Sequence, residues 1–182
     1  VKASMEIVIG MDGRKPIDIL KGYLKKGSSL LELGMGPGAD LDILGQFYEA
    51  TGSDTSSIFL DLYRKRNPKA DLMLLDAQTL ETEKRFDCIY SNKVLMHLEK
   101  DGLVRSFERQ MDILNHGGIA FHSFWRGQGQ ELMEDLMFVY YEIEDIEAML
   151  PKGLSVIESG IYDEDKKNDS FYVILKKTEK TS

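Results

Sequence analysis

The chain has 182 residues, with 23 Lys and Arg against 31 Asp and Glu, which gives a formal net charge of −8. That charge argues against a nucleic-acid or anionic-membrane binder, because such partners require a positive surface. With 42% hydrophobic and 30% charged residues, the composition is that of a soluble globular protein, and the length predicts one domain over residues 1–182.

The sequence contains few features that indicate a cellular compartment. The single cysteine, Cys88, cannot form an internal disulfide, so nothing indicates an oxidising compartment. No apolar run approaches the ~20 residues that span a bilayer. The first residues, VKASMEIVIGMDGR, lack the apolar core of a signal peptide. We therefore expect a cytoplasmic protein without a membrane segment.

Predicted helices and strands alternate over most of the chain. Helices are expected at 16–26, 40–48, 56–66, 103–114 and 143–150, and strands at 28–34, 49–53, 71–76, 85–92 and 118–125. The tail differs, because the strand-like segments 153–162 and 170–177 flank a polar loop and predict an antiparallel hairpin. Alternation of this kind predicts an α/β fold, with a mostly parallel sheet covered by helices on both faces.

A glycine-rich turn joins the first predicted strand to the second helix. Residues 30–40, LLELGMGPGAD, place Gly34, Gly36 and Gly38 between these elements. Glycines allow a sharp turn and a close approach of ligand to backbone, and the following helix offers its N-terminus to an anionic group. A tight turn without a ligand is the alternative, and three glycines in five residues argue against it.

The turn is compatible with two cofactor classes. Gly34-x-Gly36-x-x-Ala39 satisfies the dinucleotide fingerprint G-x-G-x-x-G/A, and Asp54 lies where that fold expects a ribose-binding acid. Glu32 and the additional Gly38 favour the other class. Together they make E-x-G-x-G-x-G, which resembles motif I of the class I S-adenosylmethionine-dependent methyltransferases.

The resemblance continues in chain order over about residues 30–125. The segments that carry it are TGSD ending at Asp54, Leu75-Asp76-Ala77, FDCIYSNKVLMHL at 86–98, and NHGGIA at 115–120. It implies a Rossmann-like sheet of seven strands in the order 3-2-1-4-5-7-6, with strand seven antiparallel, and S-adenosylmethionine as cofactor.

The same resemblance assigns the nucleoside contacts of the cofactor. Asp54 corresponds to the acid that binds both ribose hydroxyls, by charge-assisted hydrogen bonds. Asp76, Ala77 and Leu95 correspond to the adenine pocket. Thr55 stands where the family usually has an apolar residue that packs on adenine, and it still presents a methyl group.

The methionine end of the cofactor is expected at the turn itself. The backbone of residues 34–38, including Met35, provides the close approach. Carbonyl or carboxylate partners for the ammonium group are expected at Glu32 and around Ser91 and Asn92.

Catalytic residues are less defined, because methyl transfer from a sulfonium mainly requires alignment of donor and acceptor. A general base is needed only for an acceptor that arrives protonated. His122 is the best candidate, although a packing or substrate-contact role is the stronger interpretation. Tyr140 and Tyr141 are candidates for an acceptor pocket, with core packing as the alternative.

Four other side chains have both a structural and a functional interpretation. We expect His97 to be structural and Cys88 to lie in the core. Arg126 is interpreted as a solvated loop residue or a contact for an anionic acceptor. Lys93 follows the fourth predicted strand, where it can face either the site or solvent.

No metal site is predicted. The acidic loop at 163–169 lacks the glycine and final glutamate of a calcium loop. The segment after the predicted strand at 85–92 also lacks the N/D-P-P-Y/F motif, which in this family accompanies methylation of planar amino nitrogens in nucleic acid or protein.

The function predicted from these features is transfer of a methyl group from S-adenosylmethionine to a small-molecule acceptor on O, N or C, with S-adenosylhomocysteine as product. We expect a monomer or homodimer, with residues 125–142 and the N-terminal residues building the acceptor site. Two alternatives remain, a nicotinamide-dinucleotide-binding Rossmann protein and a non-catalytic methyltransferase-like binding subunit.

Overall fold

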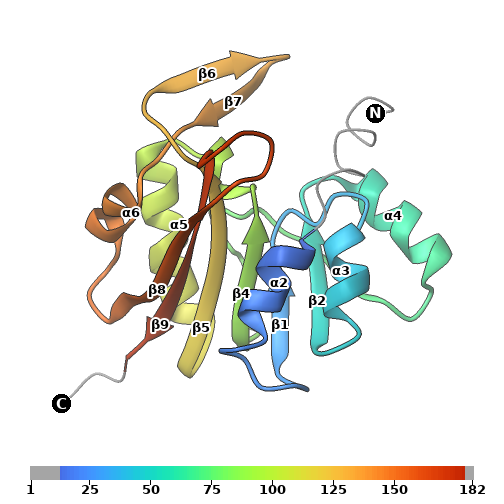
Figure 1. Ribbon diagram of the computed structural model, residues 1–182. Coiled ribbons are helices and arrows are strands. Elements are labelled where there is room, and N and C mark those ends of the chain that lie inside the picture. The colour runs from blue at the N-terminus through green and yellow to red at the C-terminus, as the bar shows by residue number, and fades with distance from the viewer. Residues whose placement is uncertain (1–12, 179–182) are drawn as a thin grey trace.

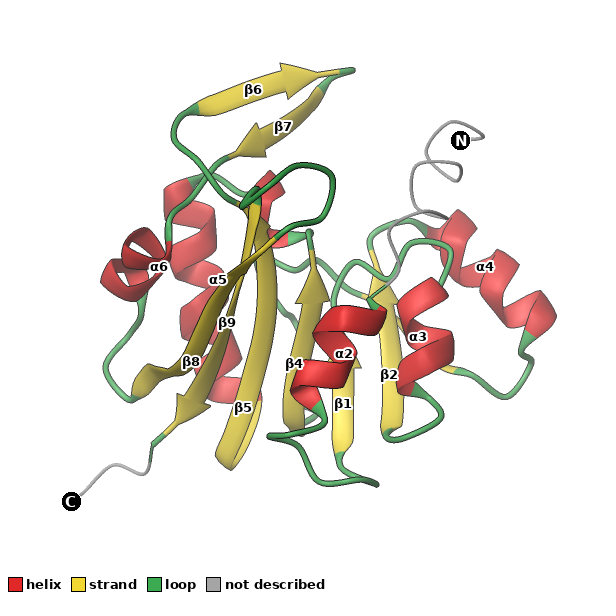
Figure 2. Cartoon of the chain, viewed as in Figure 1, coloured by secondary structure: helices red, strands yellow, loops and turns green. Residues whose placement is uncertain are grey.

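The computed structural model describes residues 13–178, which form a twisted sheet between two layers of helices (Figures 1 and 2). The main sheet has the order β3-β2-β1-β4-β5-β9-β8, and a separate two-stranded sheet joins β6 to β7. The strands are β1 (Ser29–Glu32), β2 (Glu49–Asp54), β3 (Asp71–Leu74), β4 (Phe86–Asn92), β5 (Leu114–Trp125), β6 (Gln130–Met133), β7 (Leu136–Val139), β8 (Leu154–Tyr162) and β9 (Ser170–Lys177). The helices are α2 (Arg14–Leu20), α3 (Ala39–Leu44), α4 (Ser57–Arg66), the 3₁₀ helix η1 (Leu95–His97), α5 (Lys100–Ile113) and α6 (Ile143–Met149).

The predicted strand order is confirmed. β9, the seventh strand of the main sheet, lies between β5 and β8 and is antiparallel to both. The five remaining strands pair in parallel from β3 to β5. The Rossmann-like α/β prediction is therefore correct for the described residues.

Helices cover both faces of the sheet, with α2, α3 and α4 on one side and α5 and α6 on the other (Figure 1). Successive residues of β1 face opposite layers of helices. Leu30 packs in the cluster that contains Ile17 of α2, and Leu31 packs in the cluster that contains Phe107 of α5. Both leucines are fully buried. Burial on two faces explains why this strand is a continuous apolar run without polar alternation.

Two predicted helices end early. α2 stops at Leu20 and α3 at Leu44, where the sequence predicted continuation to 26 and 48. Tighter turns follow each helix, with the Gly22 N–H bonded to the Ile19 carbonyl and the Gln46 N–H to the Ile43 carbonyl. Gly22 and Gly45 lie at these points, and glycine weakens a helix because its backbone loses the most freedom on ordering.

The segment between Trp125 and Glu142 contains a feature that the sequence did not predict. β6 and β7 form an antiparallel hairpin that stands above the rest of the molecule (Figure 1). The predicted turn at 115–118 also differs, because β5 already begins at Leu114 and passes through this segment with an irregular register against β4.

The order of the strands indicates which edge of the sheet is suited to ligand binding. The chain leaves β1 and enters β2 on one side, while β4 pairs on the other side of β1, so the strand order reverses between β1 and β4. Ligands of open α/β sheets bind beyond the carboxyl ends of the strands at such a reversal. Among the described helices, none is long and apolar enough to cross a membrane.

Candidate functional site

The glycine turn lies at this reversal point, between β1 and α3. Gly34, Gly36 and Gly38 have φ angles of +61°, +52° and +96°, in the left-handed region that favours glycine. Backbone hydrogen bonds fix the turn to β2, since the Met35 N–H donates to the Ser53 carbonyl at 2.8 Å. The Gly36 N–H donates to Asp54 Oδ2 at 2.9 Å.

The three glycines serve different purposes. A Cβ at Gly34 would lie 2.6 Å from Val94 Cγ1, and one at Gly38 would lie 2.3 Å from the Tyr63 ring, so packing excludes side chains there. A Cβ at Gly36 would meet nothing within 4 Å. Gly36 therefore faces open space on the ligand side of the turn.

Glu32 ends β1 directly before the turn and is 3% exposed. Its Oε1 is buried and has no hydrogen-bond partner among the described residues. Burial raises the pKa of this carboxyl well above its ordinary value, and the nearby Asp40 and Asp54 raise the pKa further. A buried polar atom without a partner carries a desolvation cost, so it indicates a place where a bound group completes the hydrogen bonding.

Asp54 ends β2 and lies beside the turn. Its two oxygens accept hydrogen bonds from backbone N–H groups, Oδ2 from Gly36 and Oδ1 from Ser56, both at 2.9 Å. The carboxylate is half-buried and has further lone pairs for a ligand hydroxyl. Thr55 follows it and is exposed.

Asp40 belongs to this site, and the sequence analysis missed it. Its carboxylate is 7% exposed and accepts hydrogen bonds from Gly13 N at 2.7 Å, Tyr90 Oη at 2.8 Å and Asn92 Nδ2 at 3.2 Å. These bonds connect the start of α3 to the segment before α2 and to β4. An acid in the first turn of a helix that follows a glycine turn is the signal that could have indicated it.

The predicted adenine residues lie after β3 and at η1. Asp76 is exposed, and its Oδ1 accepts a hydrogen bond from Gln78 N at 2.8 Å, in a local turn. The Ala77 carbonyl accepts one from Ser106 Oγ at 2.6 Å. Leu95 is fully buried at the start of η1, within the core cluster below α5.

Two predicted cofactor residues point elsewhere. The Met35 side chain is 4% exposed and packs with Leu41 and Tyr63, so only its backbone belongs to the turn. Ser91 is fully buried, and its Oγ lies 2.6 Å from His122 Nδ1. The alternation of side chains along a strand directs Ser91 to the α5 face of the sheet while its neighbour Asn92 faces Asp40.

His122 is not available as a general base. It is fully buried, with Nδ1 at 2.6 Å from Ser91 Oγ and Nε2 at 2.7 Å from Gln110 Oε1 of α5. Burial lowers the pKa of this imidazole to about 3. Both ring nitrogens are engaged inside the protein, so the catalytic interpretation is wrong and the packing interpretation fits.

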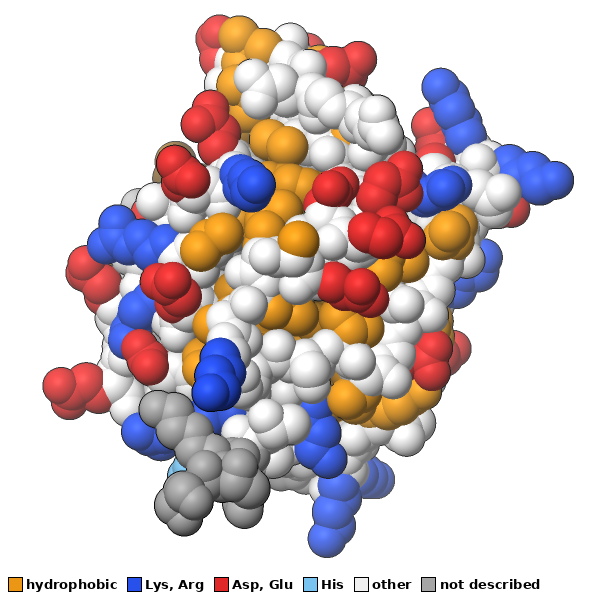
Figure 3. Space-filling model, turned by 90° about the vertical axis from the view of Figure 1, so that its left-hand side faces the viewer, with side chains coloured by type: hydrophobic (Ala, Val, Ile, Leu, Met, Phe, Trp, Pro, Cys, Tyr) orange, Lys and Arg blue, Asp and Glu red, His pale blue; other side chains and the backbone are white. Residues whose placement is uncertain are grey.

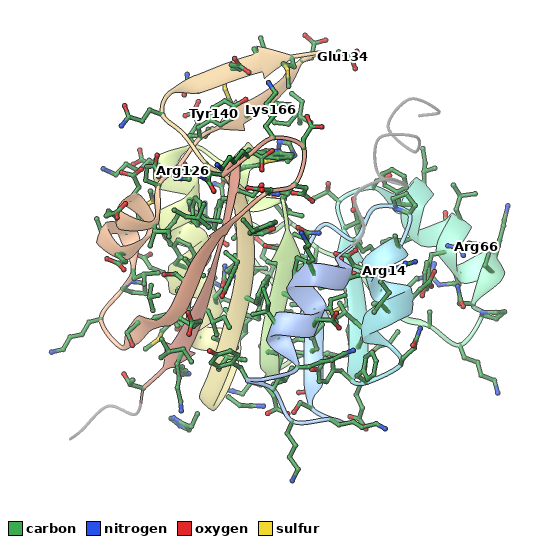
Figure 4. The ribbon with its side chains drawn as sticks, in the orientation of Figure 1. Arg14, Arg66, Arg126, Glu134, Tyr140 and Lys166 are labelled. Carbon is green, nitrogen blue, oxygen red and sulfur yellow. The ribbon has the colours of Figure 1, made fainter. Side chains whose placement is uncertain are left out.

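The two tyrosines differ from each other. Tyr141 is 5% exposed, its Oη donates to the Leu98 carbonyl at 2.9 Å, and burial raises its pKa to about 12, so it is a core residue rather than part of a pocket. Tyr140 is half-buried at the foot of the hairpin, where its Oη donates to Glu131 Oε2 at 2.9 Å (Figure 4). Of the two tyrosines, only Tyr140 is not buried.

The β6–β7 hairpin is held to the sheet edge by His97. The His97 Nδ1 lies 2.9 Å from the Met137 carbonyl, and its ring packs edge-on against Phe138. This agrees with the structural role expected for His97. Seen from the β8 side, hydrophobic side chains run through the middle of the face, with acidic and basic side chains around them (Figure 3). The exposed apolar residues of the hairpin are Leu132, Met133 and Leu136.

The cations near the ends of β4 and β5 are ion-paired. Lys93 pairs with Glu164, and Arg126 Nε lies 2.9 Å from Glu142 Oε2. Cys88 is fully buried, as expected for a core residue. In residues 13–178, no group of three or more His, Cys, Asp or Glu side chains is arranged to hold a metal ion.

A shallow cavity of about 480 Å³ lies at the opposite end of the sheet, where Ser29, Glu49 and Asp71 begin β1, β2 and β3. Its lining includes Leu41 and Tyr63, which pack beside the turn, but none of the three turn glycines and none of the carboxylates of Glu32, Asp40 and Asp54. Hydrogen-bonding demand, not hollow volume, therefore locates the candidate site.

Comparisons with known proteins agree with this geometry. Residues 30–118 match a family model described as a methyltransferase domain. A curated trans-aconitate 2-methyltransferase from Methylobacterium radiotolerans is 33% identical over 92 residues, which are 49% of this chain and 35% of that protein. The chain thus spans about a third of the length of this relative.

Solved structures share the fold at low sequence identity. A SAM-dependent methyltransferase from Methanosarcina mazei has a TM-score of 0.78 and 16% identity, over 88% of this chain and 97% of that chain. The 1,6-didemethyltoxoflavin-N1-methyltransferase of Burkholderia thailandensis, solved with 1,6-didemethyltoxoflavin and S-adenosylhomocysteine bound, has a TM-score of 0.76 and 19% identity, over 91% and 78% of the two chains. Residues 30–118 are thus similar to a methyltransferase domain, and the described residues share the strand order and fold of these methyltransferase structures.

Proposed function

We propose that the chain binds S-adenosylmethionine at the glycine turn and transfers its methyl group to a small-molecule acceptor, with release of S-adenosylhomocysteine. The observation that carries the donor assignment is Glu32 Oε1, which is buried and unpartnered directly before a turn whose central glycine faces open space. An ammonium group bound here would donate a hydrogen bond to this oxygen and favour the ionised carboxylate.

The residues present fit the donor. Glu32 and the backbone of 34–38 would hold the methionine end, with Asn92 beside them. Asp54 would hold the ribose hydroxyls. Asp76, Ala77 and Thr55 would border adenine, whereas the fully buried Leu95 would support this pocket from the core. These assignments follow the family resemblance and the positions of the side chains at the edge of the sheet.

When bound, the donor supplies an activated sulfonium methyl group. The protein contributes alignment and exclusion of water, and proximity of this kind supplies much of a rate enhancement. Of the described imidazoles, His122 is enclosed below α5, and His97 uses its Nδ1 to contact the Met137 carbonyl of the hairpin. An acceptor that already carries a lone pair, or ionises readily, fits this arrangement.

A small acceptor is supported by the names of the relatives and by the hairpin. The relatives include proteins that act on trans-aconitate and 1,6-didemethyltoxoflavin. The β6–β7 hairpin and Tyr140 lie beside the same edge of the sheet, where they would border an acceptor (Figure 4). Compounds of these two kinds are therefore the first to test.

The donor assignment is tested by replacing Gly36 with Ala. The added methyl group enters the space that faces the ligand, so the affinity for S-adenosylhomocysteine, measured by calorimetry, should fall roughly tenfold or more, a change of about 1.4 kcal/mol. Gly117→Ala is the matched control, because Gly117 has a φ of +72° and its Cβ would also meet nothing within 4 Å. It lies at the start of β5, remote from the turn, and should leave the affinity unchanged.

Thermal shift separates the cofactor classes. A ligand at 100 times its Kd stabilises the fold by about 2.7 kcal/mol, so S-adenosylhomocysteine should raise the melting temperature. A rise with NADH and none with S-adenosylhomocysteine would overturn the assignment. A screen for S-adenosylhomocysteine release over small metabolites tests catalysis, and tight cofactor binding without release in a broad screen would favour a non-catalytic binding subunit.

A further inference from the structure

Lys93 lies at the junction between the donor site and the neighbouring strands. Both of its chain neighbours contact the donor side: Asn92 Nδ2 bonds to Asp40 Oδ2 at 3.2 Å, and the Val94 methyl groups face Gly34. Lys93 itself has a φ of +57°, in the left-handed region. A residue with a Cβ is strained there and keeps this conformation only where its surroundings hold it.

The Lys93 side chain extends away from the donor site, toward β8 and β9. It is 8% exposed and forms an ion pair with Glu164, which is 16% exposed. Its Nζ also donates to Tyr162 Oη at 3.3 Å and Ser170 Oγ at 3.0 Å. Each of the three N–H groups of the ammonium thus has an acceptor, on Glu164, Tyr162 or Ser170. The ammonium in addition lies 3.9 Å from the centre of the Trp125 ring.

Burial lowers the pKa of the Lys93 ammonium, and the Glu164 carboxylate offsets part of that effect. An exposed ion pair contributes little, whereas a buried one is costly to break, because one charge then remains without a partner. The low exposure of both side chains places this pair in the second class. We call Lys93, Glu164, Tyr162 and Ser170 the Lys93 clasp.

The Lys93 clasp contacts the loop of residues 163–169, which is also held by hydrogen bonds within itself. The carboxylate of Asp169 accepts hydrogen bonds from the backbone N–H groups of Glu164, Asp165 and Lys166, at 2.8–3.0 Å. The Arg126 N–H bonds to the Asp169 carbonyl at 2.7 Å. Residues 163–169 therefore form one braced unit, and a few anchors decide where that unit sits.

This loop lies at the ligand edge of the sheet. β9 is antiparallel to β5 and β8, so the loop between β8 and β9 is at the same edge as the carboxyl ends of β4 and β5. Trp125 pairs with Ser170 across β5 and β9. Figure 4 shows Lys166 of the loop near Arg126 and Tyr140, above the strands.

We propose that Lys93 is a positioning residue, whose ion pair and ring contact fix the 163–169 loop and the Trp125 ring as the acceptor-side wall of the site. The proposal rests on the proposed function, which places the donor at the glycine turn. The backbone of Lys93 thereby connects donor contacts on one side to an acceptor wall on the other.

The test uses Lys93→Met, which retains the aliphatic stem and removes the ammonium, and Glu164→Gln, which removes its partner. Lys166 and Lys167 lie in the loop, so trypsin reports on its opening. Cleavage after these lysines should become roughly tenfold faster in both variants, because proteolysis follows the population of the open form. Lys93→Arg keeps the charge and should restore slow cleavage.

Trp125 provides a second, spectroscopic readout, because it is the single tryptophan of the chain. Acrylamide quenching of its fluorescence should increase in Lys93→Met and return toward the original value in Lys93→Arg. Lys21→Met is the matched control. Lys21 pairs with Asp18 and lies 3.8 Å from the Phe47 ring centre, but this pair is exposed and its loss should change neither readout.

The outcomes separate this inference from the proposed function. Unchanged cleavage and quenching in both Lys93→Met and Glu164→Gln would overturn the positioning role. A loss of S-adenosylhomocysteine affinity as large as in Gly36→Ala would also contradict it, because the clasp acts on the acceptor side. If the unmodified chain does not bind S-adenosylhomocysteine, the proposed function fails while both loop readouts still decide whether the clasp exists. With an acceptor from the release screen, Lys93→Met should raise the KM of the acceptor more than that of S-adenosylmethionine.

Discussion

Charged side chains differ in how fully they are partnered on the two sides of the ligand edge. On the donor side, beside β1 and β2, Glu32 is buried with one oxygen unpartnered, and Asp54 is only half-buried. On the acceptor side, beside β4 and β5, Lys93 and Arg126 are ion-paired with Glu164 and Glu142. Groups left unsatisfied by the protein indicate what a ligand must supply, whereas satisfied groups do not.

This difference explains why the cofactor can be inferred more readily than the acceptor. The donor side leaves a Glu32 oxygen without a partner and open space next to the Cα of Gly36, and both features describe the group that would bind there. The acceptor side uses its cations, its loop and its tyrosines in contacts within the protein. Three substitutions test this contrast.

The largest effect is expected from Asp54→Asn. Removal of the charge weakens hydrogen bonds to the ribose hydroxyls, and hydrogen bonds to charged groups contribute about 1.5–3 kcal/mol, so the Kd for S-adenosylhomocysteine should rise about 10- to 100-fold. Calorimetry measures this change. Asp71→Asn is the control, because Asp71 lies on the neighbouring strand β3, at its opposite end, where Oδ2 accepts from Thr51 Oγ1 at 2.8 Å. Equal affinities of Asp54→Asn and the unmodified chain would remove Asp54 from the site.

The second test replaces Glu32 with Gln. Because burial raises its pKa, folded Glu32 keeps a proton that the unfolded chain releases above its ordinary pKa of 4.5. Its contribution to stability is therefore present at low pH and lost as the pH rises through the raised value. Glu32→Gln should increase the free energy of unfolding at pH 7.5, because the neutral amide has no charge to desolvate, and should weaken S-adenosylhomocysteine binding.

Urea unfolding at pH 5 and pH 7.5 measures the change in the free energy of unfolding, and calorimetry measures the change in S-adenosylhomocysteine affinity. Glu49→Gln is the control, because Glu49 is exposed on β2. A Glu32→Gln variant that is less stable at pH 7.5 and binds the ligand normally would show that Glu32 is a satisfied structural acid. The contrast between the two sides would then fail.

The third test concerns the acid dependence of stability and uses His122, whose replacement should leave cofactor binding unchanged. Burial lowers its pKa to about 3 from 6.5, so the unfolded chain binds a proton between these values that the folded chain does not. Stability is present above pH 6.5 and lost as the pH falls toward 3, with a slope of at most about 1.4 kcal/mol per pH unit. His122→Gln should remove this part of the acid dependence in urea unfolding.

The control is His116→Gln, because His116 is exposed at the start of β5. It should keep the acid dependence of the unmodified chain. An identical slope in His122→Gln and the unmodified chain would mean that His122 titrates normally, and a general-base role would then have to be reconsidered.

Sequence patterns predicted most of the sheet and missed the hairpin for a physical reason. Strands such as β1 and β4 are apolar on both faces, and that burial is visible as a continuous hydrophobic run. β6 and β7 have exposed or half-buried residues throughout, so no core enforces a period on QELM and LMFV. The hairpin contacts the rest of the fold through His97 and the Met137 carbonyl, which are distant in the chain.

The site shows the same division. Glu32, Gly36 and Asp54 lie within 23 residues of sequence, and the turn that joins them is local, so their grouping was predictable. Asp40 was missed because its role depends on Tyr90 and Asn92 of β4. His122 was placed on the correct strand, but only the packing of α5 shows that Gln110 occupies its second nitrogen.

By itself, the sequence determined the α/β class, the strand order through family resemblance, and the glycine turn with its acids, because these depend on local backbone chemistry and on the period of burial. Only the tertiary structure decided which way the side chains after β4 and on β5 face. It turned Ser91 toward His122, Asn92 toward Asp40 and Lys93 toward Glu164. The physical reason is that a strand side chain has two faces to choose from, and the helices and loops packed against each face decide which one satisfies it.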